Sequence, residues 1–138
     1  MSQSKFVELI QELCLTMDIA QADQVLDGSP VCINNVSFSV IHDPIQSQER
    51  LYLYGSLGID ALKDNPEAQR ALLGINQDLF LEYGMCLAIT PTDNKLIICH
   101  GLSMESLTAK DIIEQMKYAA SIADSCKELF TETPASFC

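Results

Sequence analysis

The chain has 138 residues, with 8 basic and 19 acidic side chains, and its formal net charge is -11 at pH 7. This length suits one domain, and a hydrophobic content of 48% excludes intrinsic disorder because it is enough to build a core. Nucleic acid and anionic membranes are excluded as partners, since both are bound through clustered Lys and Arg, and this chain scatters its few basic residues.

The first thirty residues predict a helix and then a polar loop. Apolar side chains spaced three and four residues apart predict a helix over residues 5–17. The members of its apolar face are Phe6, Leu9, Ile10, Leu13, Cys14 and Met17. Residues 18–30 are polar and end in Asp27-Gly28-Ser29-Pro30, which is a turn signal.

Three strands are predicted next, over residues 31–33, 36–41 and 51–54. In the second strand Val36, Phe38 and Val40 alternate with serines, which is the period of a half-buried strand. We expect the third strand to end at Gly55, since Gly55 and Gly58 close this apolar run.

A second long helix is predicted over residues 66–83, with Asp64 or Asn65 as its N-cap, Pro66 in its first turn and Gly84 at its C-terminal end. Strands over residues 85–90 and 95–100 follow as a hairpin. The last helix opens at Thr108-x-x-Asp111 and continues toward Phe130.

The order of these elements is α-β-β-β-α-β-β-α. Short connections between the strands predict an α+β fold, in which helices pack on a twisted, largely antiparallel sheet. We expect a single domain over residues 1–130 and a flexible tail over residues 131–138. The N-terminus shows no signal-peptide pattern and no run is long enough for a membrane helix, so we expect a cytoplasmic protein.

The residue types that carry chemistry form no recognisable motif. A Cys99/His100 dyad fails because neighbouring residues on a strand point to opposite faces, whereas pairing of Cys86 with His100 or of Cys32 with His42 stays open. No phosphate loop and no metal-binding cysteine spacing is present. We therefore expect no catalytic, cofactor-binding or metal-binding residue, and six free thiols.

Helix 66–83 carries more apolar surface than a single contact face requires. Its main stripe consists of Ala68, Ala71, Leu72, Ile75, Leu79 and Tyr83. Leu73 and Phe80 lie seven residues apart and form a second stripe on another side. Either a loop covers this second stripe or it is a subunit interface, and we favour the interface and predict a homodimer.

Small size, acidity and element order also fit a known family, and four segments carry the best local match. They are Arg50-Leu51-Tyr52-Leu53-Tyr54-Gly55, Asp64-Asn65-Pro66, Leu72-Leu73-Gly74-Ile75-Asn76 and Leu96-Ile97-Ile98-Cys99. In these features the chain resembles the effector-specific, Tir-chaperone-like type III secretion chaperones. The resemblance implies a bacterial cytoplasmic homodimer with no cofactor and no enzymatic activity. Such a chaperone binds the unfolded N-terminal segment of a secreted effector and keeps it soluble and export-competent.

The resemblance leads us to expect two sites. The expected dimer interface comprises Leu72, Leu73, Ile75, Asn76, Leu79, Phe80, Leu87 and Ile89. For the effector we expect a strand edge at Val31 and Ile33 that pairs with the incoming segment. Beside it we expect an apolar groove between the first helix and the sheet, lined by Phe6, Leu9, Ile10, Leu13, Val36 and Phe38.

Two other interpretations fit the same composition. The first is a small α+β metabolic enzyme with a thiol or carboxylate site, which would need a concave pocket with convergent polar groups and a perturbed titratable residue. The second is a chaperone-like regulatory domain without a secretion partner.

Overall fold

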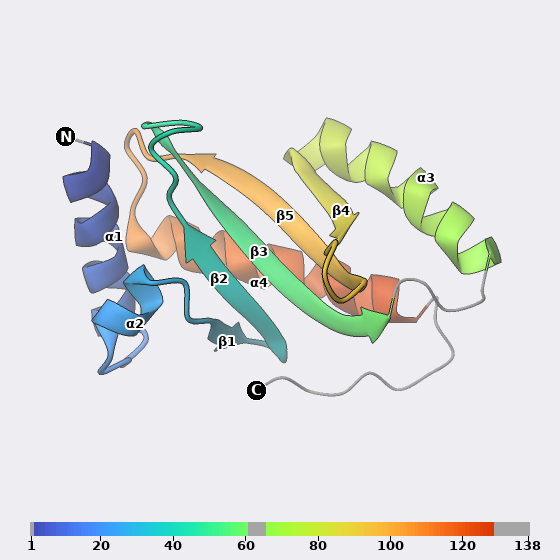
Figure 1. Ribbon diagram of the computed structural model, residues 1–138, viewed down its shortest axis with the longest axis horizontal. Helices are drawn as coiled ribbons and strands as arrows, with labels where there is room; N and C mark the ends of the chain where they lie inside the picture. Colours follow the sequence, from blue (N-terminus) through green and yellow to red (C-terminus); the bar gives the residue numbers. More distant parts are fainter. Residues whose placement is uncertain (1, 61–65, 129–138) are drawn as a thin grey trace.

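A computed structural model describes residues 2–60 and 66–128, in which five strands form one antiparallel sheet (Figure 1). The strands are β1 (Val31–Ile33), β2 (Val36–Ile41), β3 (Arg50–Asp60), β4 (Met85–Ile89) and β5 (Lys95–Ser103). Their order across the sheet is β1-β2-β3-β5-β4, so β1 and β4 are the outer strands. The helices are α1 (Ser2–Thr16), α2 (Ala22–Leu26), α3 (Pro66–Tyr83) and α4 (Ala109–Lys127).

The core lies between α4 and one face of the sheet. Figure 1 shows α4 crossing behind the strands, with α1 and α2 toward one end of the molecule and α3 beside β4 at the other. Val36, Phe38 and Val40 of β2 are buried on the α4 side, and Ile112 and Met116 of α4 are fully buried against the sheet. The predicted α+β fold is therefore confirmed, and the opposite sheet face is not crossed by any helix of the described residues.

Two of the helix-end signals predicted from the sequence are present in the structure. Thr108 and Asp111 form the predicted capping box, in which each backbone N–H donates to the other residue's side chain at 3.0 and 3.2 Å. Gly84 follows α3 with a φ of 68°, the left-handed conformation that glycine adopts without steric cost. The expected caps Asp64 and Asn65 and the tail 131–138 lie outside the described residues.

Two sequence-based expectations are wrong. Residues 18–30 are not simply a loop, because Ala22–Leu26 form the short helix α2, which Val25 anchors in the core at 3% exposure. The third strand does not stop at Gly55 but continues to Asp60. Gly55 lies inside the strand, at a position where a Cβ would come within 2.7 Å of the Phe38 ring. A glycine fits there because it has no Cβ.

Candidate partner-binding surface

The exposed side of α3 carries large apolar side chains. Leu73, Phe80 and Leu81 are 72%, 68% and 71% exposed, and Ile89 on the neighbouring strand β4 is 47% exposed. The predicted second stripe is therefore uncovered in the described part of the chain. Grouped apolar side chains of this size on a soluble protein mark interaction surfaces more often than single ones do.

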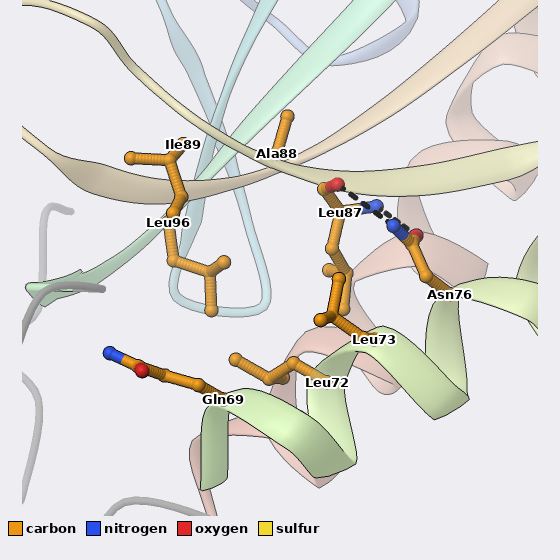
Figure 2. A pocket seen from close by; sticks show the side chains of 8 residues that line it. All are labelled: Gln69, Leu72, Leu73, Asn76, Leu87, Ala88, Ile89 and Leu96. Atoms are coloured by element: carbon orange, nitrogen blue, oxygen red, sulfur yellow. Dashed lines mark hydrogen bonds between the residues drawn. The ribbon is translucent and has the colours of Figure 1, made fainter. Parts of the chain in front are cut away.

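A cavity of about 370 Å³ lies between α3 and strands β4 and β5. Figure 2 shows Gln69, Leu72 and Leu73 of α3 facing Ile89 and Leu96 of the strands across this space. Leu87 and Asn76 complete the wall, while Ala88 points to the other side of its strand. The lining is mostly apolar and no catalytic set of polar groups converges on it, so the cavity suits an apolar side chain rather than a polar substrate.

Asn76 fixes α3 to the outer edge of β4. Its side-chain amide donates to the Leu87 carbonyl oxygen at 3.2 Å, and its side-chain oxygen accepts from the Leu87 N–H at 2.6 Å (Figure 2). The amide group therefore occupies this position of the outer edge as a neighbouring strand would. This contact holds the helix beside the sheet edge, while Leu73 and Phe80 stay exposed.

The expected dimer residues divide into a buried and an exposed set. Leu72, Leu79 and Leu87 are buried within the chain, and Ile75 and Asn76 are partly buried. Leu73, Phe80 and Ile89 are exposed and available to a partner. The sequence did not single out Gln69 and Leu96 as members of this surface, although Gln69 lies one helical turn before Leu73.

All eight residues expected to bind the effector are buried. Phe6, Leu9, Ile10, Leu13, Val31, Ile33, Val36 and Phe38 are each at most 7% exposed. The expected groove between the first helix and the sheet is not open, because α1 packs on α4 and these side chains fill the core themselves. Near these residues, a partner could therefore contact the backbone of β1, which is an outer strand of the sheet.

The two histidines have structural partners. His42 Nε2 lies 3.1 Å from the Gln48 carbonyl oxygen, and its ring contacts Phe6. His100 is buried, its Nε2 lies 3.0 Å from Oε1 of Gln115, and burial lowers its pKa. His100 is the register partner of Met85 rather than of Cys86, so Cys86 and His100 point to opposite sheet faces and cannot pair. Among residues 2–60 and 66–128 no group of His, Cys, Asp and Glu could hold a metal ion.

The expectation of six free thiols is wrong. Cys14, Cys86, Cys99 and Cys126 are free, but Cys32 is disulfide-bonded. Cys138 lies outside the described residues. None of the helices in the described ranges is long and apolar enough to cross a membrane.

Comparison with known proteins adds a family and a fold. Residues 8–119 match the Tir chaperone protein (CesT) family. No curated protein sequence matches the chain significantly. The fold is similar to a chain of the HopA1-SchA chaperone-effector complex, with a TM-score of 0.70 and 18% identity over 91% of this chain and 97% of that one.

Two further solved structures share the fold. A chain of the ExsC-ExsE complex matches with a TM-score of 0.59 and 16% identity, over 78% of this chain and 77% of that one. The Yersinia pestis type III secretion chaperone SycH, in complex with a stable fragment of YscM2, gives a TM-score of 0.52 and 14% identity, over 90% and 98% of the two chains.

Proposed function

Because the chain belongs to the Tir chaperone protein (CesT) family, we propose that it holds the unfolded N-terminal segment of a type III effector in the bacterial cytoplasm. The observation that carries this proposal is the family match over residues 8–119 together with the chaperone fold. Members of this family are chaperones and not enzymes, so the chain is not an enzyme. Binding keeps the effector segment soluble and competent for export.

We propose a homodimer that forms through α3 and β4. The exposed Leu73, Phe80 and Ile89 supply the apolar contact, and the cavity beside them is open to a side chain from the second copy. Burying each of these side chains contributes roughly 1.5–3 kcal/mol before the costs of association. The dimer contact does not include Leu72, Leu79 and Leu87 directly. These three residues are buried in the core and hold in place the helix and strand that carry the exposed surface.

For the effector we propose the outer edge of β1. An incoming extended segment would add a strand beside Val31–Ile33, and its affinity would come mainly from backbone hydrogen bonds. The exposed acidic side chains Glu8 and Glu12 on α1 and the net charge of -11 favour a segment with Lys or Arg between its apolar residues. Ordering an unfolded segment costs entropy, so the contact must extend over a large area.

The test is co-expression of the full chain with the N-terminal segment of a type III effector from the same genome. We expect a stable complex in which the segment resists proteolysis but gains little fold of its own. Amide hydrogen exchange should slow at residues 31–33. Absence of a complex with every such segment would overturn the chaperone function, and slowing confined to residues 85–128 would overturn only the β1 site.

A further inference from the structure

Two cysteines lie directly opposite each other on the sheet face that α4 does not cover. Cys86 of β4 and Cys99 of β5 are register partners. The backbone N–H and C=O of Leu87 both bond to Asn76 at the outer edge, so those of Cys86 point toward β5. The two cysteines therefore form a hydrogen-bonded pair of antiparallel strands, in which Cα atoms lie about 5.5 Å apart, a common Cα separation in disulfides.

The two thiols differ in access to solvent. Cys86 is exposed, whereas Cys99 is partly buried between Cys86 and Tyr54, its partner on β3. Burial, followed by the charge of Cys86 and a hydrogen bond between the two thiols, raises the pKa of Cys99 to about 12. An external reagent therefore meets Cys86 first. Once Cys86 has reacted, it no longer opposes ionisation of Cys99 through its own charge.

We propose that Cys86 and Cys99 are a modification site, at which a small-molecule disulfide converts the dithiol to a cross-strand disulfide. With glutathione disulfide, the Cys86 thiolate attacks one sulfur, the reagent's S–S bond breaks and one glutathione thiolate leaves. Cys99 then loses its proton to solvent, and its sulfur attacks Sγ of Cys86 and expels the second glutathione. The protein gives up two electrons and two protons, and the reagent leaves as two glutathione thiols.

The product would join β4 covalently to β5. Leu87, the residue after Cys86, holds α3 through Asn76, so the bond would anchor the strand on which α3 depends. The other free cysteines of the described ranges, Cys14 and Cys126, are buried, and burial raises the pKa of both thiols. They are therefore poor competitors for the reagent.

The experiment treats the folded, full-length chain with glutathione disulfide and maps its peptides without reduction. Trypsin cleaves after Arg70, Lys95 and Lys110, so Cys86 falls in peptide 71–95 and Cys99 in peptide 96–110. We expect these two peptides to appear as one cross-linked species that separates on reduction. Peptide 118–127, which carries Cys126, should remain unmodified and reports that the protein stayed folded.

Two matched variants test the order of the steps. Cys99→Ser should accumulate one glutathione on peptide 71–95, because no second thiol displaces it. Cys86→Ser should leave peptide 96–110 unmodified over the same time. A wild-type chain that keeps glutathione on Cys86 without forming the cross-link would overturn the proposal, and so would a Cys86→Ser chain whose Cys99 reacts as fast as Cys86 does in the wild type.

Discussion

Gly55 shows how one residue without a side chain allows two strands and an aromatic ring to pack. It lies in the middle of β3, where a Cβ would lie 2.7 Å from the Phe38 ring and 3.0 Å from Ile98. Gly55→Ala should therefore lower the free energy of unfolding by about 1–3 kcal/mol, as overpacking of a core does. Urea denaturation measures this change.

Gly74 is the matched control, because a Cβ there meets nothing within 4 Å on the exposed side of α3. Gly74→Ala should raise stability by up to about 1 kcal/mol through helix propensity alone. Equal stability of the two variants would contradict the tight packing of Gly55 against Phe38.

His100 makes the stability depend on pH. Burial lowers its pKa below the ordinary 6.5, so the folded protein binds fewer protons at this site than the unfolded chain does. Its contribution is therefore fully present above about pH 6.5 and is lost as the pH falls below that value. His100→Gln should flatten this part of the profile in denaturation experiments across a pH series. A His100→Gln chain whose stability keeps the same pH dependence as the wild type would refute the role of His100.

At the scale of elements, the position of α3 depends on Asn76. Asn76→Ala removes both hydrogen bonds to Leu87 and should lower the free energy of unfolding by about 1–3 kcal/mol, because the edge N–H and C=O lose their partners. Amide exchange at Leu87 should accelerate at the same time. Gln77→Ala changes the exposed neighbour and should affect neither quantity. Unchanged exchange at Leu87 in Asn76→Ala would show that the helix is held by other contacts.

The sequence predicts those elements whose signals are local. The capping box at Thr108, the glycine at position 84 and the alternation in β2 each depend on residues close in the chain, and the structure has them where expected. The sequence does not predict the short helix α2, because only Val25 of its five residues is buried. One buried residue cannot show the 3.6-residue spacing of apolar side chains that indicates a helix. Gly55 suggests a strand end from the sequence alone, and its role inside β3 depends on its closeness to Phe38, a residue of another strand.

The candidate site was predictable only in part, for the same reason. The second stripe on α3 follows from helix geometry, and Leu73 and Phe80 are indeed exposed. Which apolar residues of α1 and β1 form the core depends on how α4 packs, and sequence spacing carries no information on that. The opposition of Cys86 and Cys99 likewise depends on the register of the β4–β5 hairpin.

At the scale of the whole molecule, the two ends of the sheet differ in what they offer to a partner. Near β1 the apolar side chains of α1 are used inside the chain, and the exposed side of α1 is largely polar. Near β4 the helix α3 stands beside the sheet edge and presents apolar side chains outward (Figure 1). The second copy that we propose would cover this surface, since isologous packing buries the same residues on both chains.

Phe80→Asp tests this arrangement. A charge in the centre of the proposed interface should cost about 2 kcal/mol or more, which weakens dimerisation at least about thirtyfold. Light scattering should then report the monomer mass of 15.2 kDa, against twice that value for the wild type. Leu15→Asp is the matched control, because Leu15 is 83% exposed on α1, far along the chain from the proposed interface, and this variant should remain dimeric. A wild-type chain that scatters as a monomer would refute the dimer itself. A Phe80→Asp chain that stays dimeric would instead move the interface away from α3, to a surface that does not need this ring.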